Sequence, residues 1–215
     1  TPSYTFFSNE AGTISYGGSS CSPGETSAIS GTNSISFGTL SDASYSNCTI
    51  TVTDSAGNAS SALSVNTFVV DTTAPTLSQA TAVTNPTNDT TPSYVFSSNE
   101  AGTISYGGSC SSSTTSASSG SNSITFNTLS ENTYSNCTIT VTDTVSNASS
   151  ALSVNTFVVD TTAATVAEVT VVTTLSNDNT PSYTFSSNEA GSISYGGSCS
   201  SSTTSATSGN NAIIF

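Results

Sequence analysis

The chain consists of short runs in which apolar and polar residues alternate, separated by turns rich in Gly, Asn and Asp. Ser93–Ser98 alternates so that Tyr94 and Phe96 share one face, and Cys137–Asp143 alternates in the same way. A period of two residues is the pattern of a half-buried β-strand, and no run has a helical period. The pattern therefore predicts an all-β fold.

About seven short strands are expected in the central part of the chain, which is typical of an immunoglobulin-like β-sandwich. The segment Ser111–Ser121 has almost no pattern and is either an edge strand or a loop. Tyr134 lies where a tyrosine corner is expected in such a sandwich. The other predicted strands are Leu77–Val83, Thr103–Tyr106, Asn122–Leu129 and Leu152–Asp160.

The pattern is repeated three times. TPSYTFFSNEAGTISYGGSSC begins at Thr1, TPSYVFSSNEAGTISYGGSC at Thr91 and TPSYTFSSNEAGSISYGGSC at Thr180. The spacing is 90 positions (91 − 1) and then 89 (180 − 91). A fixed period predicts repeated domains stacked in series. We expect three: residues 1–74 without the first strand, residues 75–163 complete, and residues 164–215 without the last two strands. These ranges are called the first, second and third copies below, and we expect the chain to be a segment of a longer polypeptide.

The charge is of one sign only. The chain has 13 acidic residues, no Lys, Arg or His, and a formal net charge of −13. Nucleic-acid binding and attraction to an anionic membrane surface both require cationic side chains, so this segment is expected to do neither, and it contains no membrane-spanning run. A composition rich in Ser and Thr could indicate a disordered stalk, but the periodic Tyr, Phe, Ile and Val favour a folded core.

Cysteines recur with the same period. Cys21 and Cys48 are 27 positions apart, as are Cys110 and Cys137. One disulfide in each copy explains both pairs, and Cys199 would then pair with a residue about eleven positions beyond the segment. This arrangement predicts a disulfide framework of an extracellular protein. Buried free thiols are the alternative, and zinc is disfavoured because His and CxxC motifs are absent.

The segment TVTDSAGNASSALSVNTFVVDTTAPT (Thr51–Thr76) resembles the end-of-domain signature of bacterial immunoglobulin-like tandem repeats in giant surface adhesins and biofilm-associated proteins. In that family the last hairpin reads TDxxGN and the linker reads DTTAP. The second copy departs from this pattern to TDTVSN (Thr142–Asn147) and DTTAAT (Asp160–Thr165). The resemblance implies a secreted, rod-like protein of head-to-tail domains on the cell surface, often stiffened by calcium at the domain junctions.

Recurring acidic residues provide candidate calcium ligands. Because strand direction alternates in a sandwich, each acidic loop can be assigned to one end of its domain, and stacking would gather four carboxylates at each junction. Calcium takes six to eight oxygen ligands, which these carboxylates and nearby carbonyls could supply. The alternative is that they are ordinary turn residues. The first set is Asp42, Asp71, Glu100 and Asp143, and the second set is Asp89, Glu131, Asp160 and Glu189.

The sequence argues against catalysis. Hydrolytic triads need a base such as His or Lys, and a carboxylate pair would need a cleft that these short loops do not provide. We therefore expect a structural spacer of an extracellular adhesin or surface fibre, contacting neighbouring repeats or other copies, with no cofactor besides calcium. A filament assembled by strand exchange between chains is the alternative. A carbohydrate-binding module ranks last, because most Tyr and Phe fall on core-facing positions.

Overall fold

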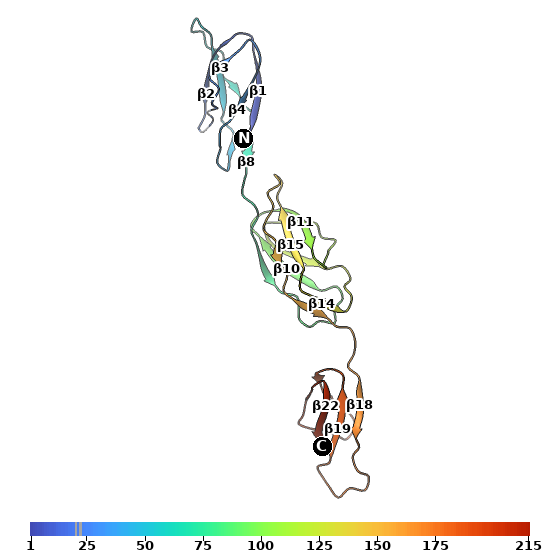
Figure 1. Cartoon of the computed structure of the whole chain (residues 1–215). Coiled ribbons are helices and arrows are strands. Elements are labelled where there is room, and N and C mark those ends of the chain that lie inside the picture. Colours follow the sequence, from blue (N-terminus) through green and yellow to red (C-terminus); the bar gives the residue numbers. More distant parts are fainter. Residues whose placement is uncertain (20, 22) are drawn as a thin grey trace. The chain divides into compact units, whose positions relative to one another are not determined.

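The computed structural model describes residues 1–19, 21 and 23–215 and is all-β, with no helix in these ranges (Figure 1). Accordingly, the described residues contain no apolar helix of membrane-spanning length. The chain divides into two compact units. The first comprises residues 1–84, 91–129 and 134–157, and the second comprises residues 85–90, 130–133 and 158–215. The domain boundaries expected at 74/75 and 163/164 stay a prediction.

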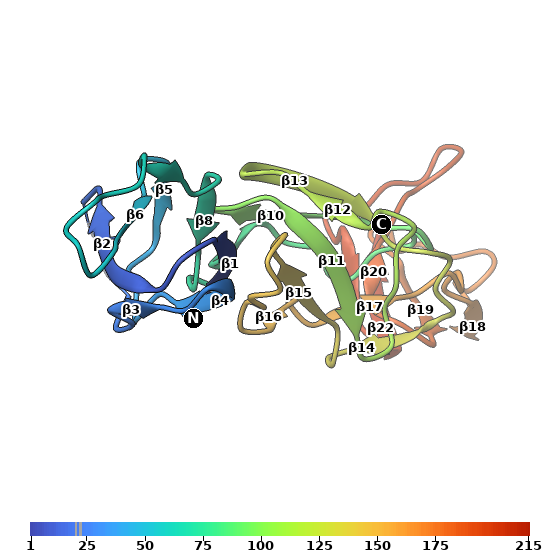
Figure 2. The same cartoon turned by 90° about the horizontal axis from the view of Figure 1, so that it is seen from above.

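The first copy forms three small antiparallel sheets. Their strand orders are β1-β4, β3-β2-β6-β7 and β5-β8. Seen end-on, the labelled strands surround the interior of the copy (Figure 2). The strands are β1 (Ser3–Ser8), β2 (Gly12–Gly17), β3 (Ser27–Ala28), β4 (Gly31–Ser36), β5 (Ala43–Tyr45), β6 (Thr49–Thr53), β7 (Leu63–Ser64) and β8 (Phe68–Val70).

The second copy repeats these pairings and adds one strand, β9, beside β10. The strand orders are β13-β10-β9, β12-β11-β15-β16 and β14-β17. The strands are β9 (Leu77–Thr81), β10 (Ser93–Ser98), β11 (Gly102–Gly107), β12 (Ser116–Ala117), β13 (Gly120–Thr125), β14 (Asn132–Tyr134), β15 (Thr138–Thr142), β16 (Leu152–Ser153) and β17 (Phe157–Val159).

The third copy contains the counterparts of the earlier strands only. Its strand orders are β18-β19-β22 and β20-β21. The strands are β18 (Val166–Thr170), β19 (Ser182–Ser187), β20 (Gly191–Ser192), β21 (Ser205–Ala206) and β22 (Gly209–Ile214). β20 is two residues long, whereas its counterpart β11 has six, because no strand equivalent to β15 lies beside it.

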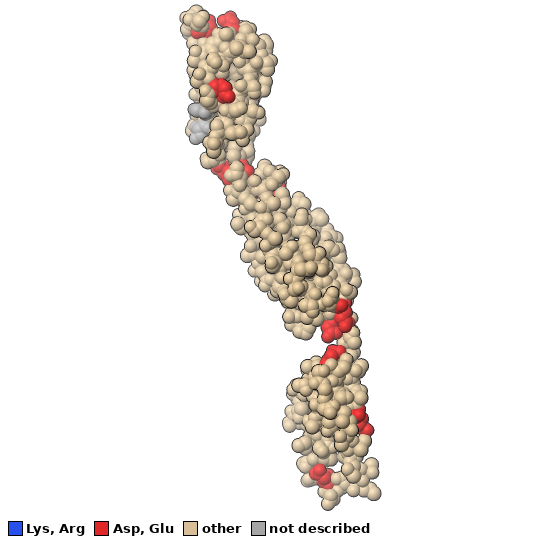
Figure 3. All heavy atoms as spheres, in the orientation of Figure 1, with Lys and Arg blue, Asp and Glu red and all other residues tan. Residues whose placement is uncertain are grey.

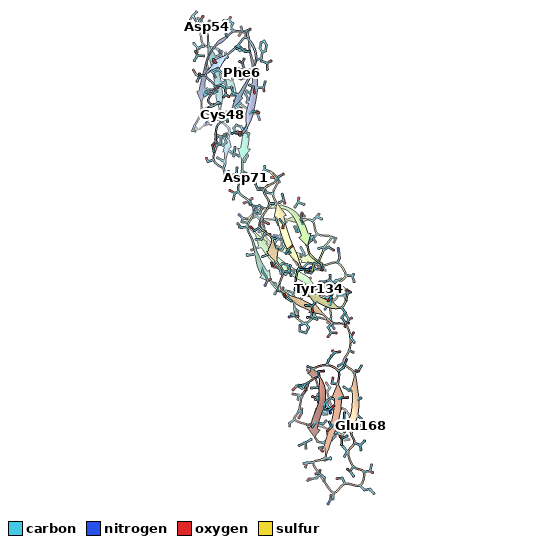
Figure 4. The ribbon with its side chains drawn as sticks, viewed as in Figure 1. Phe6, Cys48, Asp54, Asp71, Tyr134 and Glu168 are labelled. Carbon is cyan, nitrogen blue, oxygen red and sulfur yellow. A yellow bond between two sulfur atoms is a disulfide. The ribbon has the colours of Figure 1, made fainter. Side chains whose placement is uncertain are left out.

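Each of the first two cores is formed by residues from different sheets. In the first copy Phe6 and Ile35, from β1 and β4, share one buried cluster with Ile14 and Ile50, from β2 and β6. Figure 4 shows Phe6 within this copy. In the second copy the largest fully buried side chains include Tyr94, Phe96, Ile139 and Val141, from β10 and β15. Apolar faces of different sheets buried together are consistent with the β-sandwich class.

The predicted strand Leu152–Asp160 is divided in the structure. β16 pairs with β15 in one sheet, and β17 pairs with β14 in another. Asn155 lies at the break and uses its side-chain amide to bond the backbone of Val83. The chain therefore crosses from one sheet to another at this point, which strict alternation did not predict.

Both predicted disulfides are present. Cys21 bonds Cys48 with a Cα–Cα distance of 5.5 Å, and Cys110 bonds Cys137 with a Cα–Cα distance of 5.3 Å. Each bond links the segment after β2 or β11 to the residue before β6 or β15. Cys199 is a free thiol and is exposed.

Candidate cation site

Three of the predicted calcium ligands lie together. Asp71, Glu100 and Asp143 each place one carboxylate oxygen within 4.8 Å of the others, and all three residues are half-buried. Asp71 directly follows β8, Glu100 is in the turn after β10, and Asp143 directly follows β15. It is the one acidic or thiol cluster of this kind in residues 1–19, 21 and 23–215.

The hairpin turn after β15 holds Asp143 in place. Its Oδ1 accepts hydrogen bonds from Val145 N at 2.9 Å and Asn147 N at 2.8 Å, and its Oδ2 accepts one from Asn147 Nδ2 at 2.8 Å. Desolvation raises the pKa of Asp143, but the bonds from Asn147 and Val145 outweigh it and bring the pKa below its ordinary value. The carboxyl group is therefore held in the ionised form that a cation needs.

The same turn occurs in the first copy. Asp54 Oδ1 accepts bonds from Ala56 N and Asn58 N, both at 2.8 Å, and Asn58 Nδ2 donates to Asp54 Oδ2 at 2.9 Å. The side-chain bond from Asn58, followed by its backbone bond, lowers the pKa of Asp54. Figure 4 labels Asp54 in this hairpin, after β6. The recurring TDxxxN pattern thus forms one local structure in both copies.

Asn147 connects this turn to the linker. Its Nδ2 donates to the backbone oxygen of Asp71 at 3.2 Å as well as to the side chain of Asp143. Asn147 is not among the site residues predicted from the sequence. The sequence signal that could have identified it is its place as the Asn that closes the TDxxxN hairpin pattern, because a side-chain amide can both donate and accept hydrogen bonds.

Glu100 is positioned by a compact turn. Ser98 Oγ donates to Glu100 O at 2.6 Å, and Asn99 Nδ2 donates to Glu100 Oε1 at 3.2 Å. Asn99 Oδ1 also accepts a bond from Thr76 N at 2.6 Å. The linker residue Thr76 and the turn that carries Glu100 are therefore directly bonded.

Asp42 is not part of the cluster. Its Oδ1 accepts bonds from Thr72 N at 3.0 Å and Thr72 Oγ1 at 2.8 Å, and its Oδ2 accepts one from Thr73 Oγ1 at 2.6 Å. The bond from the Thr73 side chain, followed by that from Thr72, lowers the pKa of Asp42. Its role in the structure is to cap the linker.

The second predicted set, described within its own unit, forms no such cluster among the described residues. Glu131 Oε2 accepts bonds from Thr161 Oγ1 at 3.0 Å and Thr162 Oγ1 at 2.7 Å, which lower its pKa, the Thr162 bond contributing most. Asp160 Oδ1 accepts from Thr162 N at 3.1 Å. Asp89 N bonds Thr87 Oγ1 at 3.0 Å, and Glu189 Oε1 accepts from Asn188 Nδ2 at 2.9 Å.

Sequence equivalence explains the difference between the two sets. Asp160 and Glu189 are the counterparts of Asp71 and Glu100, each 89 positions later. The counterpart of Asp143 would be at position 232, outside the 215 residues. The counterpart of the hairpin carboxylate that completes the first cluster is therefore not among these 215 residues.

The donors of the cluster are suited to one class of cation. Three carboxylates and nearby carbonyl oxygens are hard ligands, which calcium and magnesium prefer, whereas zinc favours the nitrogen and sulfur ligands that are lacking here. Acidic side chains form small separate groups on a surface without Lys or Arg (Figure 3). A cation would neutralise the mutual repulsion of the three carboxylates.

Comparisons with protein-family models, curated proteins and solved structures give no match to this chain.

Proposed function

We propose that the chain is a spacer region of an extracellular cell-surface adhesin or surface fibre, made of tandem immunoglobulin-like domains. The observation that carries the proposal is the repetition of one β-sheet arrangement, with an equivalent disulfide, in two successive copies. Near-identical domains in series provide length, whereas distinct binding sites would require loops that differ between copies. Disulfides support an oxidising, extracellular location.

The acidic cluster suggests how such a spacer is stiffened. Asp71 belongs to the linker after the first copy, and Glu100 and Asp143 belong to loops of the second copy. Calcium bound by all three would tie the linker to those loops, in addition to the Asn147 bond to Asp71 O. Without a cation the three like charges oppose that arrangement.

Small-angle scattering of the 215-residue chain, with calcium and then with chelator, tests both the spacer role and the stiffening by calcium. We expect a larger maximum dimension and a stiffer profile in calcium, reversed by chelator. The matched control is the triple variant Asp71→Asn, Glu100→Gln, Asp143→Asn, which should not respond to calcium. Equal profiles of the wild-type chain in both solutions would overturn the stiffening role, and a collapsed particle in both would overturn the spacer role.

A further inference from the structure

A short segment near the beginning of the second copy pairs with the strand that ends it. Thr87, between β9 and β10, forms a parallel β-bridge with Val159 of β17. Thr87 N donates to Val158 O, and Asp160 N donates to Thr87 O, both at 2.9 Å. All four residues belong to the second compact unit. They form a parallel ladder between the two ends of this copy.

A side chain adds a third bond to this ladder. Val158 N donates to Asn85 Oδ1 at 2.9 Å, where a longer strand would provide a backbone acceptor. Pro86 has no N–H, but it lies between the two bonded residues, and alternate residues of a strand bond to a given neighbour. The sequence Asn-Pro-Thr is therefore compatible with a strand that pairs through Asn85 and Thr87.

The ladder is joined to the folded core. β17 forms a sheet with β14, so both of its edges are bonded when the bridge to Thr87 is included. Val159 is 0% exposed, and Thr87 is half-buried. Bonds that are partly shielded from water are electrostatically stronger than exposed ones. The pairing of the two ends is thus a part of the fold that water does not readily replace.

The parallel direction decides how tension would load these bonds. The chain enters the second copy ahead of Asn85 and leaves it after Asp160. Tension therefore pulls the two paired segments in opposite directions along their common axis. A parallel pair loaded in this way is sheared, and its bonds break together. An antiparallel hairpin that is pulled at its two ends opens one bond at a time.

We propose that Asn85–Thr87 and Val158–Asp160 form a mechanical clamp, which sets the rate at which the second copy unfolds when the chain is pulled from its ends. Forced unfolding is governed by the barrier that leads out of the native state, and the clamp lies where the load passes from one end of the copy to the other. The inference rests on the proposed spacer function for the source of the tension, because a spacer between a cell and its target is pulled along its length.

Single-molecule stretching of the full 215-residue chain at constant force measures this rate. Handles are attached through peptide tags at both ends. Breaking the clamp releases the 71 positions from Thr87 to Val158 (158 − 87). The disulfide Cys110–Cys137 retains 27 of them. The remaining 44 positions (71 − 27) give an expected step of about 15 nm at about 3.5 Å each.

A disulfide variant assigns this step to the second copy. In the double variant Cys110→Ala, Cys137→Ala the 27 enclosed positions extend as well, so the step should lengthen by about 9 nm. The first copy keeps its own disulfide, Cys21–Cys48, and its step should stay the same. The step that changes is therefore the one in which the clamp is measured.

Asn85→Ala tests the clamp itself. Asn85 is exposed, so its substitution leaves no cavity in the core, but Val158 N loses its acceptor. We expect the second copy to unfold faster by about fivefold or more at the same force. Thr87→Pro removes the N–H that bonds Val158 O and should also speed unfolding. An unchanged rate in either variant would overturn the proposal.

Asn122→Ala is the matched control within the same copy. Asn122 Oδ1 accepts from Ser118 N at 2.8 Å, and its Nδ2 donates to Ser118 O at 2.9 Å, so its bonds close a local turn and do not join the two ends. This variant should lose free energy of unfolding in urea but keep the unfolding rate under force. Equal acceleration in Asn122→Ala and Asn85→Ala would overturn the clamp, because the rate under force would then follow overall stability.

The clamp and the spacer function can fail separately. A chain that is extended in scattering but unfolds under force independently of Asn85 would refute the clamp and keep the spacer. A chain that is collapsed in scattering but unfolds faster in Asn85→Ala would refute the spacer and keep the clamp.

Discussion

The side-chain amide of Asn155 forms two hydrogen bonds with the backbone of Val83. Val83 N donates to Asn155 Oδ1 at 2.8 Å, and Asn155 Nδ2 donates to Val83 O at 2.9 Å, although the residues are 72 positions apart. The amide thus pairs with Val83 as a neighbouring strand would. It does so where the chain leaves the sheet of β16 for that of β17.

We predict that Asn155→Ala destabilises the second copy by about 1–3 kcal/mol, the cost of leaving such backbone groups without their partner. Urea denaturation measures the change. Asn66→Ala is the matched control, because Asn66 is the counterpart in the first copy, is exposed, and donates only to Thr67 O at 3.4 Å. Equal losses of unfolding free energy in the two variants would contradict a stabilising role for the two hydrogen bonds between Asn155 and Val83.

Removing one disulfide should have a large effect. Closing a loop of 27 positions stabilises a fold by about 3.5 kcal/mol on the chain-entropy model, so the double variant Cys110→Ala, Cys137→Ala should lose free energy of unfolding of that order. Differential scanning calorimetry is the measurement. Cys199→Ser should leave the transition unchanged, and a comparable loss in that variant would refute the assignment of Cys199 as the free thiol.

The two hairpins differ at one residue with positive φ. Gly57 has φ of 90° in the first copy, and Ser146 has φ of 75° in the second. A left-handed conformation costs a non-glycine residue about 1–2 kcal/mol, so Ser146→Gly should stabilise the second copy by about 1 kcal/mol, and Gly57→Ser should destabilise the first. Thermal denaturation should show that the melting temperature rises in Ser146→Gly and falls in Gly57→Ser. Shifts of the same sign would show that the positive φ angle is not the cause of the stability changes.

Acid should weaken the first hairpin through Asp54. Hydrogen bonds from Asn58 lower the pKa of Asp54 below its ordinary value of 3.8. A folded pKa below the unfolded one means that the stabilisation is present above 3.8 and is lost as pH falls from there through the folded value. Stability of Asp54→Asn should therefore depend less on pH in this range than that of the wild-type chain. If the free energies of unfolding of the two chains, measured by urea denaturation, change with pH in parallel, then Asp54 does not contribute to the pH dependence.

Alternation and spacing predicted the parts of the fold that depend on local pattern. Tyr94 and Phe96 are fully buried as expected, and both cysteine pairs are bonded. The division of Leu152–Asp160 was missed because Val154 and Phe157 are both buried although their separation is odd, and a long-range bond from Asn155 permits that change of face.

The candidate site was predictable only in part, for a similar reason. Loop assignment to one end of a sandwich grouped Asp71, Glu100 and Asp143, whose carboxylate oxygens lie within 4.8 Å of one another, and their binding of calcium stays a prediction. It could not show that the hydroxyl groups of Thr72 and Thr73 occupy the oxygens of Asp42. Which donor satisfies a carboxylate depends on side-chain distances, which a pattern of residue types does not contain.

The segment SNCTITVTD is identical at Ser46–Asp54, which includes β6, and at Ser135–Asp143, which includes β15, and this identity has a consequence for folding fidelity. The strands that they pair with, β2 and β11, also share one sequence, GTISYG. Side-chain chemistry alone therefore does not distinguish correct from exchanged pairing. Chain entropy does: the correct bridge from Cys21 spans 27 positions, and the exchanged bridge to Cys137 would span 116 (137 − 21). Loop closure favours the shorter by about 1.3 kcal/mol, roughly a factor of ten, so each copy oxidises within itself because its own partner is nearest along the chain.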